Sequence, residues 1–305
     1  MSKEIEIPEP INRKPDEPKL KADHPTSKIK TQNKLPRNLN QGVSRFEPAP
    51  VSVELPSKGL LYKGSVDDPD LAKGIIKVRQ LTLNEEKIMT TDRLIQSGRA
   101  LDMVLENCIK SDIDAGDLLS SDRLYILFFL RGMSYGLDYD FAVRCYLCGA
   151  NFEQTVSIDK LPIKEWSEND MPIEPLIMTL PISEAIIEAH FMRGHEEHVL
   201  AEKGRETRNY NEPDSTVEDS VIALIDKVTL SDGEVLGPRD KEDFINHMVA
   251  GDVSFFRDTM TEKNCGIEQL RHIYCPRCEG ELEFNVPLGR NFFRRRESGK
   301  KPASL

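Results

Sequence analysis

Apolar residues in the first half of the chain first alternate and then recur at helical spacing. Residues 74–81, GIIKVRQL, alternate and predict a strand. Thr82-Leu83-Asn84-Glu85 has the spacing of a capping box and predicts a helix over about 83–96. Helical spacing predicts two more helices, over about 99–110 and from Ser120 or Ser121 to Gly132 or Gly136. The last of these is apolar on nearly every side and should be buried.

The second half shows a similar succession. Leu180-Pro181-Ile182-Ser183-Glu184 stands 99 positions after Leu81–Glu85, so we expect a strand followed by a helix over 175–193. A second capping box, Ser215–Glu218, precedes a helix whose apolar residues continue through Ile225 to Val228.

Turn and cap residues place the remaining elements. Asp232-Gly233 lies between apolar flanks and predicts a tight turn. Pro238 stands near the first position of a further helix. A last helix is expected from a cap at Asp252 to a stop at Gly266.

These patterns predict an α+β, predominantly helical fold built from two similar halves. Strand, capped helices and a strand–CxxC–strand unit occur in the same order twice, which indicates an internal duplication. The alternative is that any two α+β halves look alike at this level of detail. We expect a proline-rich extended arm (1–52), a first half (53–165), a second half (166–289) with a partly helical insertion (194–214), and a basic tail (290–305).

Two cysteine pairs carry the strongest chemical signal. Cys145 and Cys148 lie in CYLCG, and Cys275 and Cys278 lie in CPRCEG, each pair flanked by strand-like alternation. A CxxC pair provides two corners of a metal tetrahedron, and structural zinc sites commonly use four cysteines. The pattern predicts one Zn²⁺ shared by the two pairs in a split zinc ribbon. Vestigial pairs and a redox dithiol are alternatives, but a redox pair should open a helix, and strand-like sequence follows both pairs here.

A site of this kind should be structural, because four protein ligands leave no open position for water or substrate. Gly149 and Gly280 are expected to permit the two tight turns. Arg144, Arg271 and Arg277 are expected to offset part of the negative charge of four thiolates and one Zn²⁺. His272, three positions before Cys275, is the candidate for a substitute ligand.

The distribution of charge along the chain limits which classes of partner it can bind. The chain has 305 residues and a net charge of −11, and it contains no apolar run long enough to span a membrane. No apolar leader of the secretory type is expected at the N-terminus. Residues 1–49 carry +3 and residues 290–305 carry +5, which leaves −19 on residues 50–289. A body this acidic argues against general binding of nucleic acid, which needs clustered Lys and Arg.

The remaining cysteines and histidines have ordinary structural interpretations. Cys108 and Cys265 lie in or beside apolar helical patterns and should pack in the core. His190, His195 and His198 lie in a polar region and should be solvated. No phosphate-binding loop, G-x-S-x-G or H-E-x-x-H motif is present.

The tail offers a candidate surface for a partner. Phe292 and Phe293 precede the basic run Arg294, Arg295 and Arg296. The two aromatic residues suggest an anchor, either on the core of this chain or on a partner. The basic run is typical of docking to an acidic partner or of a solvated tail.

Several segments together resemble a known family. ELPSKGLLY, VRQLTLNEEKIM, LRGMSYG with FAVRCYLCG, and YCPRCEGELEFNVPLGRNFF are similar to baseplate hub and hub-assembly proteins of contractile-tailed phages, the T-even-like group. The resemblance covers roughly 53–293. It implies a non-enzymatic structural or assembly protein whose partners are other baseplate and tail proteins, with no small-molecule substrate and no membrane. It also implies a place in the host cytoplasm during assembly and in the tail baseplate of the virion.

Two other classes of function stay open at this point. A zinc-ribbon protein could bind nucleic acid through its basic tail, although the acidic body argues against it. An enzyme with a thiol or metal centre would need a reactive cysteine, and one tightly held zinc on all four paired cysteines would leave none among them.

Overall fold

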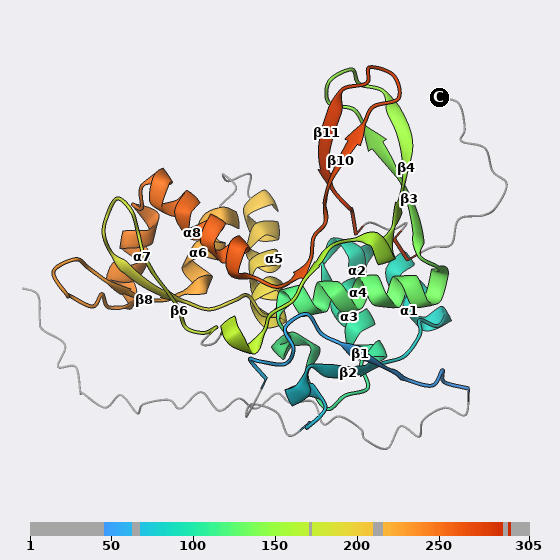
Figure 1. The fold of residues 1–305 in the computed structure, drawn as a ribbon, viewed down its shortest axis with the longest axis horizontal. Coiled ribbons are helices and arrows are strands. Elements are labelled where there is room, and N and C mark those ends of the chain that lie inside the picture. Colours follow the sequence, from blue (N-terminus) through green and yellow to red (C-terminus); the bar gives the residue numbers. More distant parts are fainter. Residues whose placement is uncertain (1–45, 63–67, 171–172, 210–215, 289–291, 294–305) are drawn as a thin grey trace, which may run out of the picture. The chain divides into compact units, whose positions relative to one another are not determined.

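Short helices and small antiparallel sheets alternate along the chain, which confirms a mixed fold of α and β elements (Figure 1). In this computed structural model the described residues are 46–62, 68–170, 173–209, 216–288 and 292–293. The helices are α1 (Leu83–Thr90), α2 (Asp92–Gln96), α3 (Arg99–Cys108), α4 (Ser120–Tyr135), α5 (Gly194–Asn209), α6 (Thr216–Leu224), α7 (Pro238–Asn246) and α8 (Ala250–Lys263). The strands are β1 (Val51–Glu54), β2 (Ile75–Val78), β3 (Asp138–Arg144), β4 (Asn151–Ser157), β5 (Ile163–Lys164), β6 (Leu176–Thr179), β7 (Ile186–Ala189), β8 (Ile225–Thr229), β9 (Gly266–Ile267), β10 (Leu270–Tyr274) and β11 (Glu281–Asn285).

The capping box predicted at Thr82 is present and begins α1. The Thr82 side chain accepts a hydrogen bond from the backbone of Asn84, and the Glu85 carboxylate accepts one from the Thr82 backbone at 2.7 Å. The predicted helix over 83–96 is divided, because Thr91 takes an extended conformation between α1 and α2. The predictions of α3 and of the buried α4 are confirmed, with Ile126, Leu127, Phe128 and Leu130 buried.

Strand β2 is the strand predicted at 74–81, and its partner β1 begins inside the predicted arm. Val51 and Ser52 pair with Val78 and Lys77, so backbone hydrogen bonds order the chain before position 53. Arm residues 1–45 lie outside the described residues.

A buried carboxylate joins the LPSKG segment to α4. Asp122 is fully buried and accepts hydrogen bonds from the Ser57 hydroxyl at 2.6 Å and the Tyr62 hydroxyl at 2.7 Å. Burial raises the pKa of Asp122. Because buried polar groups need partners, this network fixes the segment that follows β1 against the first turn of α4.

The second half contains a three-stranded antiparallel sheet in the order β6-β7-β8. The helix expected after Leu180 is therefore wrong, since Ile186–Ala189 form the strand β7. Residues 181–184 are the turn between β6 and β7. The carboxylate of Asp252 accepts hydrogen bonds from the backbone of Ile182 at 2.9 Å and Ser183 at 3.0 Å. Asp252 thereby gives two backbone N–H donors of this turn an acceptor.

Other predictions in this half have mixed outcomes. Helix α6 ends at Leu224, and Ile225 and Val228 belong to β8 rather than to the helix, because they pair with β7. Ser215 lies outside the described residues. The tight turn at Gly233 and the placement of Pro238 in the first turn of α7 are confirmed. Helix α8 is capped by Val249 and not by Asp252.

The two halves share only part of their order of elements. Both end in helix, strand, CxxC turn and strand, as in α4-β3-β4 and α8-β10-β11, where the short β9 intervenes. Before that point the first half has a two-stranded sheet and the second half a three-stranded one. A duplication of the whole half stays a prediction. One hydrophobic core contains residues of both halves.

Candidate metal centre

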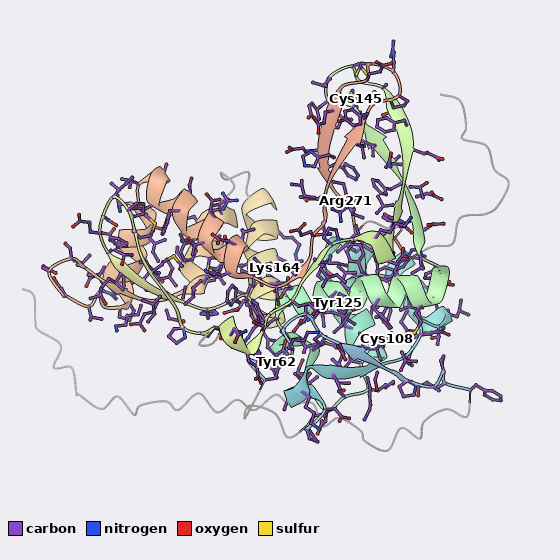
Figure 2. All side chains as sticks on the ribbon, in the orientation of Figure 1. Tyr62, Cys108, Tyr125, Cys145, Lys164 and Arg271 are labelled. Carbon is purple, nitrogen blue, oxygen red and sulfur yellow. The ribbon has the colours of Figure 1, made fainter. Side chains whose placement is uncertain are left out.

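Two β-hairpins carry the cysteine pairs and lie side by side (Figure 1). Strands β3 and β4 form the first hairpin, whose turn contains Cys145 and Cys148, with Arg144 opposite Asn151 at its end. Strands β10 and β11 form the second, whose turn contains Cys275 and Cys278. Each pair therefore occupies the end of a two-stranded ladder, as Figure 2 shows for Cys145.

The four sulfur atoms converge. All of them lie within 4.8 Å of one another. The Cys145 and Cys278 sulfurs are 3.7 Å apart, as are those of Cys148 and Cys275. Zinc–sulfur bonds of about 2.3 Å in a regular tetrahedron require sulfur atoms about 3.8 Å apart. The cysteines are free thiols, and their spacing fits a tetrahedral ion held by two ligands from each hairpin.

The two turns share one backbone pattern. The Cys145 N–H donates to the Ala150 carbonyl at 2.8 Å and the Cys275 N–H to the Gly280 carbonyl at 3.0 Å. In each turn the fourth residue after the first cysteine has a positive φ, 73° at Gly149 and 56° at Glu279. The expectation that both glycines permit the turn is therefore right for Gly149 and wrong for Gly280. Gly280 instead provides space for the other hairpin, because a Cβ there would lie 2.3 Å from Leu147 Cδ1.

Backbone donors and neighbouring thiols shift the pKa values of Cys275 and Cys278 in opposite directions. Backbone N–H groups of Cys278 and Arg277 lower the pKa of the Cys275 thiol to about 6. The N–H of Gly280 also lowers the pKa of Cys278, but the neighbouring thiols of Cys148, Cys275 and Cys145 raise it to about 12. Without a cation, four adjacent sulfurs resist becoming four thiolates, so a metal that binds them must displace their protons.

The hairpins have little apolar core of their own. Among the described residues, Cys145 and Cys275 form a small buried cluster with Ile273 and Leu282, and Val143, Ala150, Phe152 and Phe284 pack against it while partly exposed. An assembly this small rarely folds on hydrophobic burial alone, and a structural metal is a common substitute. A metal ion bound to these four sulfurs would therefore take over the stabilising role that a hydrophobic core has in other small domains.

Comparison with known families decides which proteins this chain is related to. Residues 51–294 match the family described as T4 bacteriophage base plate protein. The chain belongs to this baseplate family. Comparison with curated proteins and with solved structures finds no match. The matched range contains both CxxC turns, so the candidate metal centre lies within the family region.

The baseplate chain uses its two C-terminal phenylalanines in its own core. Phe292 is 0% exposed, and its ring lies 4.9 Å from that of Phe128 on α4 and 5.0 Å from that of Tyr139 on β3. Phe293 is also buried. Of the two alternatives for these residues, an anchor on the core of this chain agrees with the burial of both rings, and partner binding by Phe292 and Phe293 stays a prediction. Arg294, Arg295 and Arg296 lie outside the described residues.

An aromatic column that sequence reasoning missed supports the hairpins at their base. Tyr139 and Phe141 on β3 have ring centroids 5.2 Å apart, and Phe141 is 5.2 Å from Phe284 on β11. Phe292 extends the column to α4. The alternation of Tyr139, Phe141 and Val143 was a usable signal, since residues two apart share one face of a strand.

The single cysteines behave as predicted. Cys108 and Cys265 are buried. Burial raises the pKa of the Cys265 thiol to about 12, which makes it a poor nucleophile. Among the described residues the cluster of possible metal ligands contains neither of them.

Three other predicted roles are corrected. Arg271 lies near the start of β10, away from the turn that contains Cys145 (Figure 2), and donates to the backbone carbonyls of Leu270 and Glu268, so its guanidinium is not beside the sulfurs. His272 lies against Glu281 and Glu283 on β11, outside the sulfur cluster.

His190 is the third, since it is largely buried rather than solvated. It lies between Glu196 at 2.7 Å and Asp226 at 2.9 Å. Burial lowers its pKa, but hydrogen bonds to the two carboxylates outweigh burial and raise the pKa above its ordinary value. His195 and His198 contact Asp117 and Asp102 near the surface.

Proposed function

We propose that this chain is a non-enzymatic structural or assembly protein of the phage tail baseplate hub, stabilised by a structural Zn²⁺ on Cys145, Cys148, Cys275 and Cys278. The convergence of the four sulfurs carries the metal part of the proposal. Membership of the baseplate family carries the other part. Its partners are other baseplate and tail proteins, met in the host cytoplasm during assembly and retained in the virion tail if the chain is a permanent component.

The metal acts as a clamp between distant parts of the chain. The hairpin β3-β4 follows α4, whereas β10-β11 comes after α8, more than a hundred residues later. Structural zinc sites of this ligand type contribute on the order of 10–16 kcal/mol of apparent binding free energy. Because the small cluster around Ile273 and Leu282 offers little apolar burial, the ion is the main connection between the two turns.

The same geometry argues for a structural role rather than a catalytic one. Two ligands from each hairpin complete a tetrahedron and leave no position for substrate. Cys278 is the exposed member of the set, so the ion lies near the surface without an open coordination position. Four thiolates also suit iron, and metal analysis distinguishes the two ions. Among the described residues, no helix has both the length and the apolar character needed to cross a bilayer.

Metal analysis of the purified full chain tests the clamp. We expect one zinc per chain, none in the double variant Cys145→Ser/Cys148→Ser, and a lower melting temperature in that variant. Cys108→Ala and Cys265→Ala are matched controls, since they remove thiols outside the cluster and should keep the zinc. Unchanged zinc content and melting in the double variant would show that the clamp is wrong.

Co-purification tests the role in the particle. A tagged chain should recover baseplate proteins from phage-producing cells, and its presence in mature particles distinguishes a permanent component from an assembly factor. Recovery of transcription or translation machinery alone would contradict the proposal. Salt-dependent binding of DNA or RNA that is lost on deleting residues 290–305 would favour the nucleic-acid alternative.

A further inference from the structure

In the part of the chain that the structure describes, the outer strand β6 of the three-stranded sheet has an open hydrogen-bonding edge. Among the described residues, its only strand neighbour is β7. The opposite edge of the sheet is covered, because the Leu236 N–H donates to the Val228 carbonyl at 3.0 Å and Val235 bridges to Thr229. An uncovered edge presents unpaired N–H and C=O groups to any other strand.

The register identifies which groups face outward. The Leu180 N–H donates to the Ala185 carbonyl at 2.9 Å, and β6 continues antiparallel to β7 from Thr179 opposite Ile186. In antiparallel pairs, successive residues direct their backbone groups alternately toward and away from the neighbouring strand. Since Leu180 faces β7, Met178 does so too, and the backbone groups of Ile177 and Thr179 face the open edge.

Prolines end this edge at both sides and at equal spacing. The segment Pro175–Pro181 reads PLIMTLP, with each proline three positions from Met178. Both prolines fall in the same outward-facing series as Ile177 and Thr179, and neither has an N–H to donate. The usable edge is therefore short and symmetric about Met178.

The side chains of this edge lack the usual protection against pairing. No charged residue occurs between Pro175 and Pro181. Ile177 is 63% exposed on the outer face of the sheet, and Ile186 on β7 is also exposed on that face. Natural edge strands that remain unpaired commonly carry lysine or another charge.

From this symmetry we infer that β6 is a dimerisation strand that pairs antiparallel with β6 of a second copy. A two-fold axis at Met178 places Ile177 opposite Thr179 of the second copy, and Thr179 opposite its Ile177. Both pairs are hydrogen-bonded pairs, so every outward N–H and C=O of the two residues gains a partner. Pro175 then stands opposite Pro181 of the second copy, where neither strand has a donor left unsatisfied.

A second copy of this chain fits the open edge because its β6 has the same backbone donors and acceptors and the same flanking prolines, placed symmetrically about Met178. The two Met178 side chains, which face the buried side of the sheet, meet across the axis and extend each core toward the other. The result is a six-stranded sheet. This inference does not depend on the metal or on the role in the baseplate.

Charge exchange at the two exposed positions tests the pairing. In Ile177→Lys/Thr179→Lys, lysines of the two copies face one another at both cross-strand pairs. In Ile177→Glu/Thr179→Lys, each glutamate faces a lysine. Both variants change only exposed side chains and should keep the fold, which circular dichroism checks. A matched control, Val217→Lys/Val235→Lys, adds the same two charges at exposed positions away from this edge.

Sedimentation velocity of the full chain over about 1–100 μM measures the dissociation constant of the dimer. We expect the like-charge variant to weaken dimerisation about tenfold or more, and we expect the opposite-charge variant and the control to stay near the parent chain. If the parent chain is monomeric over the whole concentration range, the inference is overturned, and the β6 edge would instead be available to a strand of another protein. Equal weakening by both charge variants, or none by the like-charge variant, would overturn it as well.

Discussion

The buried ion pair between Arg79 and Glu85 should account for a large share of the pH dependence of stability. Two guanidinium nitrogens of Arg79 lie 3.0 Å from the two Glu85 carboxylate oxygens, and the Glu85 side chain is 1% exposed. Glu85 also accepts hydrogen bonds from the Thr82 backbone and hydroxyl, each at 2.7 Å. The pair therefore joins the end of β2 to the first turn of α1.

The magnitude follows from the pKa of this carboxyl. Burial raises the pKa of Glu85, but the hydrogen bonds from Arg79 and Thr82 outweigh burial and lower the pKa from 4.5 to about 2. At 1.36 kcal/mol per pKa unit, the ionised form contributes about 3 kcal/mol to the free energy of unfolding at neutral pH. Since the folded-state pKa is depressed, this contribution is complete above pH 4.5 and is lost as the pH falls toward 2.

The perturbation is Glu85→Gln, which keeps the size and removes the charge. We expect a loss of about 3 kcal/mol at pH 7, since Arg79 stays buried without its counter-charge. The difference between parent and variant should shrink to about half near pH 3, because the parent carboxylate is then largely protonated in the unfolded chain. Urea unfolding of the full chain, followed by circular dichroism at several pH values, measures both quantities.

Glu86→Gln is the matched control, because it removes a neighbouring charge from the same turn of α1. The Glu86 carboxylate accepts a surface hydrogen bond from Tyr135 at 2.8 Å, so its loss should cost less than about 1 kcal/mol. A Glu85→Gln effect no larger than that of the control, or a difference between parent and variant that does not change with pH, would refute the reasoning.

Three further predictions concern single residues. Glu279→Gly should stabilise the second turn by up to about 1 kcal/mol and Gly149→Ala should destabilise the first by about 1–2 kcal/mol, since both positions have positive φ; equal effects in urea unfolding would contradict this. The raised pKa of His190 means that its protonated form stabilises the fold below pH 6.5 and that this contribution is lost as the pH rises through the folded-state pKa. A His190→Gln variant whose deficit in urea unfolding does not shrink on going to high pH would argue against the two carboxylate contacts. Asp252→Ala should lower the free energy of unfolding by about 1–3 kcal/mol, because two backbone donors lose their acceptor. Asp258→Ala, at an exposed position of the same helix, should lower it little. Comparable shifts in melting temperature for the two variants would count against a role of Asp252 in holding the turn between β6 and β7.

Several features of this protein were predictable from the sequence because their causes are local. A capping box uses residues three apart, so the start of α1 at Leu83 follows from Thr82 and Glu85 alone. The apolar surface of α4 covers nearly every side, and burial was the only stable outcome. The CxxC spacing together with flanking alternation predicted two hairpin turns, and both are present.

Contacts between distant residues decided the features that the sequence did not reveal. Residues after Leu180 have a helix-like start, but pairing with β8 and the Asp252 carboxylate, some 70 positions away, make them a turn and a strand. The sequence left open whether Phe292 anchors on this chain or on a partner, and its ring contacts with Phe128 and Tyr139 place it in the core of this chain.

The candidate metal centre also has features that are local in the sequence and features that depend on contacts between distant residues. Cysteine spacing, a local property, determined which sulfurs could share an ion. The tertiary structure decided that they do converge, with Cys145 next to Cys278 and Cys148 next to Cys275. It also assigned different tasks to the two turn glycines, because Gly149 meets a backbone requirement of its own turn while Gly280 yields space to Leu147 of the other hairpin. The backbone conformation of a turn residue depends mainly on its neighbours in the sequence. The room available for its side chain depends on which distant residues the tertiary structure packs against it.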